Sequence, residues 1–304
     1  MRKAAVEELS RIAREDSRVV LLTADLGFGV LDDFARELPN QFVNVGVAEQ
    51  AMIGVATGLA EAGFIPYCYS IATFSFLRPF EFIRNGPVAH RLPLRIIGVG
   101  AGTDYSFDGL THYAVEDLAL ARSQPGLAVF SPATDDDTRM LVREAHALAG
   151  PAYLRLSRQG AATPSRDVRA EDPEKTDVLV LSLGTAGERA AAIAAEISEA
   201  GPSTKVLSVL RFDERTGDDL AAHLTGTRAC LTVEDHYESG GLGTAVAEVI
   251  ATRGLGIPLV LDAITSLPVG AVGSVAYLET KLRRSISELA GQVISSLKWT
   301  GDRT

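Results

Sequence analysis

Strand-like and helix-like segments alternate along almost the whole chain of 304 residues, and this alternation limits the possible folds more than any other feature. Short apolar runs suited to buried strands occur at 19–22, 42–45, 65–71, 94–99, 127–131 and 152–156. Segments typical of helices lie between them, at 4–13, 30–38, 49–62, 79–90, 113–122 and 134–148. Strands that alternate with helices predict an α/β fold with a parallel sheet covered on both faces.

A polar segment divides the chain into two parts. Residues 165–176 have almost no apolar content, which is typical of a linker between domains. A second, smaller alternation follows, with strands expected at 178–183, 206–209, 229–233 and 259–261 and helices at 186–200, 243–253 and 276–297. At about 150 residues per domain the length also favours two domains. We therefore expect α/β domains at 1–164 and 177–304.

Charge and composition exclude several classes of partner. The chain has 29 Lys and Arg against 39 Asp and Glu, a net charge of −10, which argues against nucleic acid or an anionic membrane. No apolar stretch reaches about 18 residues, so no membrane span is expected. The first 16 residues lack the apolar core of a signal peptide. Cys68 and Cys230 lie in separate apolar runs and are expected to be reduced, as in a cytoplasmic protein.

Glu49 lies where a predicted strand ends and a helix begins. Ligands of open α/β sheets bind beyond the carboxyl ends of the strands. The helix that follows is nearly all small and apolar, so Glu49 is expected at the rim of a dry region, where a carboxyl group can share a proton with a ligand. The alternative is a first-turn acid that complements the helix dipole.

Three further clusters lie at predicted strand ends. Asp108–His112 follows a Gly-rich loop and presents His112 at a helix start, free for proton transfer or merely exposed. Arg158 ends a strand, where it suits an anionic substrate group or faces solvent. Phe74, Leu77 and Phe80 are large apolar residues three apart, suited either to the core or to flanking a flat heterocycle.

Taken in order, these segments resemble the C-terminal half of the transketolase family, a pyrimidine-binding domain followed by a C-terminal domain. The resemblance covers residues 2–297 and also includes Thr23–Gly27, which is similar to the family's Ser-Ala-Asp-Leu segment with Thr in place of Ser. Its most specific segments are Asn44–Gln50, Asp108–His112, Pro125–Leu127 with Ser131–Ala133, and Leu156–Gln159. Downstream, Val233–His236 with Gly240–Gly243 is similar to the signature of the family's C-terminal domain.

The resemblance implies thiamine diphosphate as cofactor. The acid that matches Glu49 binds N1′ of the aminopyrimidine and shares a proton with it, so that the cofactor can lose its C2 proton and serve as an electron sink. The positions of Phe74, Leu77 and Phe80 imply packing on the pyrimidine ring. His112 is implied in proton transfer at substrate hydroxyls.

The same resemblance assigns the substrate end. It implies that Asp108 binds a sugar hydroxyl, that Arg158 and Arg2 bind a phosphate, and that Thr23 contacts substrate. A further phosphate-binding His of the family is replaced here by Gly100, and a Leu stands in the middle of the aromatic trio. Both departures leave the acceptor and its phosphorylation open.

The largest departure is an absence. The family's Gly-Asp-Gly…Asn motif, which binds Mg²⁺ and the diphosphate, does not occur in these residues. No metal ligands are therefore expected in this chain. We expect a partner, an N-terminal subunit, to carry that motif and hold the Mg²⁺, in an assembly with two copies of each chain.

We therefore predict the C-terminal subunit of a split transketolase, which transfers a two-carbon ketol unit from a ketose to an aldehyde. Two other thiamine enzymes are alternatives: a 1-deoxyxylulose-phosphate-synthase-like carboligase, and a 2-oxoacid dehydrogenase beta subunit. Asp108–His112 with Leu156–Gln159 favours transketolase over the dehydrogenase, whereas Gly100 leaves the carboligase open. A non-catalytic regulatory subunit is the alternative from another class, and the presence of Glu49 and His112 argues against it.

Overall fold

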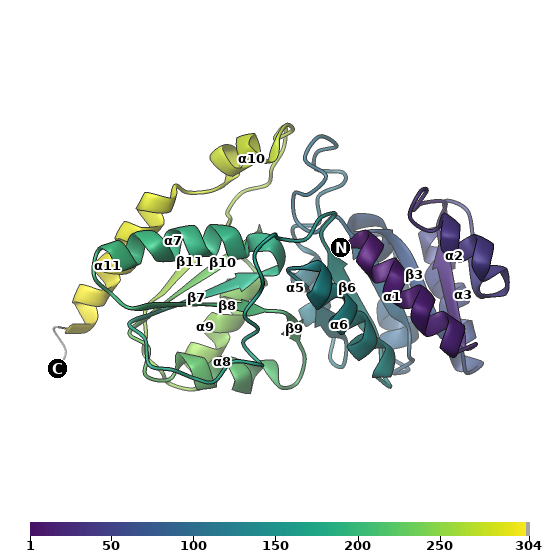
Figure 1. The fold of residues 1–304 in the computed structure, drawn as a ribbon, viewed down its shortest axis with the longest axis horizontal. Helices are drawn as coiled ribbons and strands as arrows, with labels where there is room; N and C mark the ends of the chain where they lie inside the picture. The colour runs from purple at the N-terminus through teal and green to yellow at the C-terminus, as the bar shows by residue number, and fades with distance from the viewer. Residues whose placement is uncertain (302–304) are drawn as a thin grey trace.

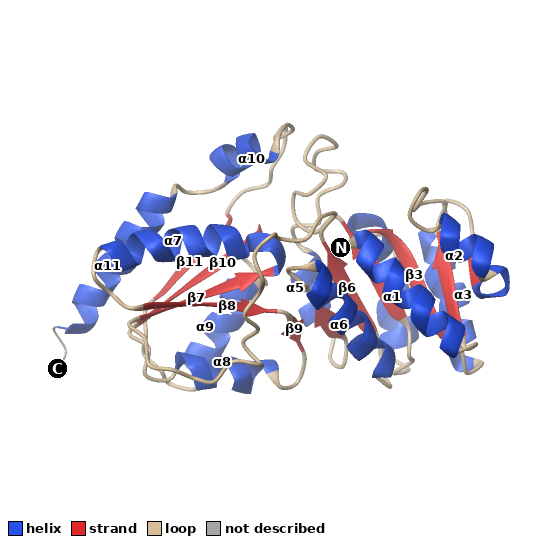
Figure 2. Ribbon diagram, in the orientation of Figure 1, coloured by secondary structure: helices blue, strands red, loops and turns tan. Residues whose placement is uncertain are grey.

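A computed structural model describes residues 1–301, so the second domain, expected over 177–304, is described as far as residue 301. Two sheets lie side by side, each between helices (Figure 1 and Figure 2). The fold is α/β throughout, as the alternation of segments predicts. The strands of the larger sheet are β1 Val19–Thr23, β2 Phe42–Asn44, β3 Ile65–Ile71, β4 Arg95–Val99, β5 Ala128–Phe130, β6 Ala152–Leu156 and β9 Arg211–Phe212.

The larger sheet has seven strands in the order β2-β1-β3-β4-β6-β5-β9. The first six are parallel, whereas β9 pairs with β5 in the antiparallel direction. Because β1, β3, β4 and β6 are buried along their length, helices must cover both faces. The helices are α1 Arg2–Glu15, α2 Asp32–Glu37, α3 Glu49–Glu61, α4 Phe80–Ile83, α5 Asp117–Arg122 and α6 Asp135–Ala147.

The smaller sheet has four parallel strands in the order β11-β10-β7-β8. Its strands are β7 Val178–Leu183, β8 Thr204–Val209, β10 Ala229–Tyr237 and β11 Leu259–Ile264. The helices of this part are α7 Gly187–Glu199, α8 Thr216–Leu224, α9 Leu242–Thr252, α10 Val275–Leu282 and α11 Ile286–Gly301. Helices α7 and α11 pack on one face of this sheet, and α8 and α9 pack on the other.

Several predicted elements differ from the structure. Strand β9 and helix α8 were not predicted, since two strand residues and nine helical ones carry little periodic signal. The single helix expected at 276–297 is two helices, because Ser285 begins a new one: its hydroxyl accepts from the Glu288 N–H, and the Glu288 carboxylate accepts from the Ser285 N–H.

The helix expected at 79–90 is interrupted. Only Phe80–Ile83 is α-helical, and π-helical turns precede and follow it, at Thr73–Leu77 and Arg84–Val88. Pro79 and Pro87 lack the N–H that a continuous α-helix needs. The helix expected at 113–122 likewise begins only at Asp117. The first π-helical turn, Thr73–Leu77, directly follows the carboxyl end of β3, and π-helical turns often occur at functional sites.

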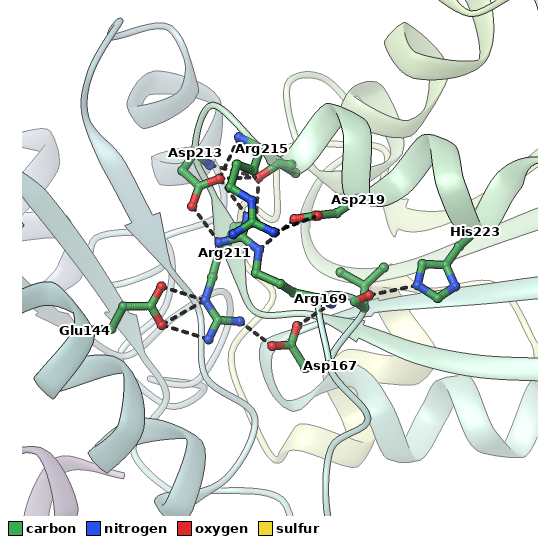
Figure 3. Close-up of polar contacts among 10 residues, drawn as sticks. Glu144, Asp167, Arg169, Arg211, Asp213, Arg215, Asp219 and His223 are labelled. Carbon is green, nitrogen blue, oxygen red and sulfur yellow. Dashed lines mark hydrogen bonds and ion pairs between the residues drawn. The ribbon is translucent and has the colours of Figure 1, made fainter. Parts of the chain in front are cut away.

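The polar segment 165–176 is fastened to both sheets. Val168 in this segment is buried, and its N–H donates to the Ser208 carbonyl of β8. Arg211 of β9 donates to Glu144 of α6 at 2.8–3.0 Å and also to Asp167 (Figure 3). One arginine therefore holds the segment against a helix of the larger sheet.

A second arginine binds the segment to α8. Arg169 donates to both oxygens of Asp213, at 2.7 and 2.8 Å, and to Asp219 at 2.7 Å (Figure 3). His223 lies 2.8 Å from the Val168 carbonyl. The segment thus follows a fixed path over the smaller sheet.

One hydrophobic cluster contains residues from both parts of the chain. It includes Leu127 and Val129 from the larger sheet together with Leu220 and Leu242 from the helices of the smaller one. Cys68 and Cys230 are free thiols buried in this cluster, as expected. No helix among residues 1–301 is long and apolar enough to cross a membrane.

Candidate active site

Most of the predicted site residues follow the carboxyl ends of neighbouring parallel strands. Glu49 comes after β2, Phe74 after β3, His112 after β4 and Arg158 after β6. Since these strands run in the same direction, their carboxyl ends lie along one edge of the larger sheet. This edge is the usual ligand-binding position of an open α/β sheet.

Glu49 is the first residue of α3 and is almost completely buried, with 2% of its surface exposed. The turn before it is shaped by Asn44, whose side-chain oxygen accepts from the N–H of Gly46 at 3.0 Å. Gly46 has a φ of +74°, which favours glycine. This turn directs a carboxylate into the sheet edge instead of leaving it at an exposed helix start.

The Glu49 carboxylate contacts an arginine. Arg78 Nη1 lies 2.7 Å from Glu49 Oε2, and the Arg78 guanidinium lies over the Phe74 ring, 4.4 Å from its centroid. Both residues belong to the π-helical turn after β3, because the Arg78 N–H donates to the Thr73 carbonyl five residues earlier. The turn therefore brings an aromatic face and a cation to the buried acid.

His112 contacts Phe74 and so belongs to the same cluster as Glu49 and Arg78. Its ring lies 5.1 Å from that of Phe74, in an edge-to-face arrangement, and 5.9 Å from that of Tyr105. The Thr111 hydroxyl lies 2.9 Å from His112 Nδ1 and orients the ring. Thr73 fixes the two segments together by donating to the Tyr113 carbonyl at 3.1 Å.

The other end of the cluster is cationic. The Arg158 guanidinium lies over Tyr105, 5.1 Å from the ring centroid, and the Arg158 N–H donates to Asp104. Burial raises the pKa of Asp104 and of Tyr105, and the charges of Arg158 and Arg2 oppose this increase. Arg2 and Arg158 therefore act on the same two groups although they come from opposite ends of the first domain's sequence.

Tyr105 occupies the space that a side chain at position 100 would need. Gly100 has a φ of +88°, and a Cβ atom there would collide with the Tyr105 ring. A histidine at this position is thus sterically incompatible with the present loop. Tyr105 supplies the aromatic group at this end of the site.

The structure does not bring every predicted residue into the cluster. Leu77 and Phe80 are partly buried and pack against the hydrophobic core. The Thr23 hydroxyl donates to the Leu26 carbonyl at 2.8 Å, inside the loop after β1. Asp108 is exposed, and its N–H donates to the Tyr105 carbonyl at 2.9 Å. Of these three residues, Phe74 contacts Arg78, the arginine paired with Glu49, and also His112.

Three residues of the cluster were not predicted. Arg78 was missed although it is the one charged residue in the otherwise uncharged run 65–80. Asp104 and Tyr105 lie in the Gly-rich loop after β4, where Tyr105 is the single aromatic residue between Gly100 and Ser106. A single charged residue in an apolar run, or a single aromatic residue in a Gly-rich loop, was the sequence feature that could have indicated these site residues.

The chemistry of the site follows from its groups. A buried carboxylate beside an aromatic face suits a flat, nitrogen-containing heterocycle, which gains one hydrogen bond and ring contacts. The imidazole of His112 can move protons. The two arginines, Arg2 and Arg158, can hold an anion. Among residues 1–301, however, no three His, Cys, Asp or Glu side chains come together as a metal site.

Two family models and several relatives match most of this chain. The family described as "Transketolase, pyrimidine binding domain" matches residues 1–163, and "Transketolase, C-terminal domain" matches residues 168–280. An apulose-4-phosphate transketolase subunit of Phocaeicola vulgatus is 30% identical over 275 residues, which cover 84% of this chain and 87% of that protein. A 6-deoxy-6-sulfo-D-fructose transketolase subunit of Clostridium sp. is 29% identical over 301 residues, covering 95% and 92%.

A solved structure is similar over almost the full length of both chains. It is described as a split gene transketolase, inactive beta4 tetramer, and it superposes with a TM-score of 0.83 at 31% identity. The match covers 98% of this chain and 97% of that one. The similarity therefore extends over both sheets and the segment that joins them.

Proposed function

The chain belongs to the transketolase family, and from this premise we propose that it is the C-terminal subunit of a thiamine-diphosphate-dependent split transketolase. The complete enzyme would transfer a two-carbon ketol unit from a ketose to an aldehyde acceptor. The observation that carries the proposal is the continuous cluster from buried Glu49 through Phe74 and His112 to Tyr105 and Arg158. The relatives are enzyme subunits too, which supports a role as a transferase subunit.

The residues present fit one half of the cofactor. The Glu49 carboxyl group would share a proton with the aminopyrimidine N1′, and Phe74 would border the ring. When bound, thiamine diphosphate supplies an electron sink for breaking the carbon–carbon bond next to a ketose carbonyl. Glu49 would hold or release the proton at N1′, in an environment from which water is excluded.

The substrate would lie between His112 and the cationic end. His112 is placed to move protons at substrate hydroxyls, and Asp108 lies in the same loop to accept from a hydroxyl. Arg158 and Arg2 suit an anionic group at the far end of the sugar. Thr23, at the end of β1, and the partly buried Leu77 and Phe80 would border the site from neighbouring elements.

Among residues 1–301 no group of three His, Cys, Asp or Glu side chains could hold a metal ion, and the sequence lacks a Gly-Asp-Gly…Asn motif. We therefore assign the diphosphate and its Mg²⁺ to a partner subunit that carries this motif. An uncovered apolar face supports such a partner. On α3, directly after Glu49, the side of the helix formed by Ala51, Gly54, Val55 and Gly58 is exposed. Small residues at this spacing form one continuous face suited to close helix packing. We expect the N-terminal subunit to cover this face, in a complex with two copies of each chain.

The carboligase alternative is favoured by one observation. Gly100 and Tyr105 replace the phosphate-binding histidine of the transketolase pattern with an aromatic ring. Assays of the assembled enzyme with a ketose donor, in the presence and absence of pyruvate, separate the two reactions. Product formation that requires pyruvate would contradict ketol transfer from a ketose.

Arg158→Ala tests the proposed anion subsite. We expect KM for a phosphorylated ketose donor to increase by about 10-fold, the lower end for a charge-assisted contact because Arg158 is exposed. Exchange of the cofactor's C2 proton should stay unchanged, because Arg158 lies at the far end of the cluster. Arg166→Ala, which removes an exposed arginine paired with Glu171, is the matched control. Equal changes in KM for phosphorylated and unphosphorylated donors would exclude Arg158 as a phosphate ligand.

A further inference from the structure

We propose that Arg78 is a placeholder for the cofactor: its guanidinium holds Glu49 until the aminopyrimidine binds and must then leave. This inference rests on the proposed function, because it concerns the same carboxylate. It adds a residue that opposes cofactor binding and so sets the affinity of the site. None of the sequence motifs that mark the site includes this residue.

The contacts of Arg78 place it between the two groups that a pyrimidine would need. Its guanidinium holds Glu49 Oε2 at 2.7 Å and covers the Phe74 ring at 4.4 Å. A heterocycle that bonds to Glu49 Oε2 and packs against the same face of Phe74 requires the space that Arg78 fills. The guanidinium and the heterocycle therefore compete for this position.

The burial of Glu49 explains why an arginine is paired with it. Glu49 is 2% exposed, and burying a carboxylate without a charged partner destabilises the folded state. Arg78 supplies that partner to Glu49. It would thereby stabilise the folded chain before the cofactor and the partner subunit arrive.

Arg78 is also able to leave. Its side chain is 41% exposed, so its departure returns a guanidinium to water and not to the protein interior. The residue stands at the end of the π-helical turn Thr73–Leu77, and its long side chain can rotate without moving the backbone. Phe74, in the first half of the turn, can stay in place as the wall of the site.

The experiment compares cofactor affinity with stability in Arg78→Met, which keeps the length of the side chain but removes its charge. In the assembled two-chain complex with Mg²⁺, calorimetry should show the Kd for thiamine diphosphate lowered by about 5- to 10-fold, as expected for loss of a half-exposed charged hydrogen bond. The Tm of this chain alone should fall by about 2–4 °C, because Glu49 loses its partner. Arg84→Met is the control, since exposed Arg84 contacts Asn85.

Opposite signs in these two measurements distinguish a placeholder from a structural residue. An arginine that only shaped the site would, when removed, lower stability and weaken cofactor binding together. If Arg78→Met does not fold, Arg78→Gln keeps a donor without the charge and should tighten binding by about 2- to 3-fold. A Kd that is unchanged or higher in the variant that folds would overturn the placeholder role, while cofactor binding by the wild-type complex would still support the proposed function. No binding by the wild-type complex would instead overturn the proposed function itself.

Discussion

Glu49→Gln is expected to reduce turnover of the assembled enzyme by about 100-fold or more while the chain keeps its fold. The amide oxygen of glutamine can still accept from Arg78, so the contact between the two side chains is retained. The amide cannot, however, exchange a proton with N1′ as a carboxyl group does. The loss should therefore appear in catalysis and not in the Tm.

The measurement that isolates this role is exchange of the thiazolium C2 proton for deuterium in the assembled complex. We expect exchange to slow in parallel with turnover. Glu61→Gln, at the exposed far end of the same helix, is the matched control and should behave as wild type. Near-normal C2 exchange in Glu49→Gln would exclude Glu49 as the group that activates the cofactor.

Asp117→Ala should cause the largest loss of stability. Asp117 is completely buried and accepts from Arg155 Nε at 2.9 Å and from the Tyr153 hydroxyl at 2.7 Å. Burial, reinforced by Asp117, raises the pKa of Tyr153 well above its usual value, so the phenol remains a donor. Removing the carboxylate leaves a guanidinium buried without a charge partner, which typically costs about 3–5 kcal/mol in the free energy of unfolding.

The same network reaches the active-site loop. Arg155 also donates to the Asp235 carbonyl of β10 at 2.9 Å, and the Asp235 carboxylate accepts from the N–H of Thr103 at 2.7 Å. Thr103 lies in the loop that carries Tyr105. Loss of Asp117 should thus loosen both the contact between the two sheets and one wall of the site.

Urea denaturation checks this expectation. Asp136→Ala provides the control, because the Asp136 side chain is 99% exposed and its removal should change stability by less than about 0.5 kcal/mol. A loss below about 1 kcal/mol in Asp117→Ala would show that the buried pair contributes little, as is known for some ion pairs that can be replaced without cost.

The parallel sheets could be predicted from the sequence because their strands are uninterrupted apolar runs. Strands such as Val178–Leu183 are buried on both faces, so hydrophobicity alone marks them. Strand β9 has two residues and runs antiparallel, and its pairing with β5 depends on the path of the chain after β8. Periodicity carries no information about such a contact.

Part of the candidate site could be predicted because its motifs follow recognisable strands. Motifs at strand ends locate Glu49, His112 and Arg158, because topology brings the carboxyl ends of parallel strands to one edge. The three-residue spacing of Phe74, Leu77 and Phe80 suggested one shared face. A π-helical turn, with i→i+5 hydrogen bonds, changes that face, and so Phe74 meets Arg78 and His112 while Leu77 and Phe80 pack inward.

In the enzyme that we propose, this chain holds the pyrimidine and substrate side of the site, and another polypeptide anchors the diphosphate. One hydrogen bond and ring contacts offer little against the entropic cost of immobilising a ligand, whereas Mg²⁺ and charge-assisted phosphate contacts should provide most of the affinity. Cofactor and partner should accordingly tighten each other's binding.

Calorimetry on this chain alone, with Mg²⁺ and thiamine diphosphate, tests whether the cofactor needs a second polypeptide to bind. We expect no binding heat and no transferase activity, and both should return when a second polypeptide with a Gly-Asp-Gly…Asn motif is added. A micromolar Kd for thiamine diphosphate without that second polypeptide would contradict the split-site account.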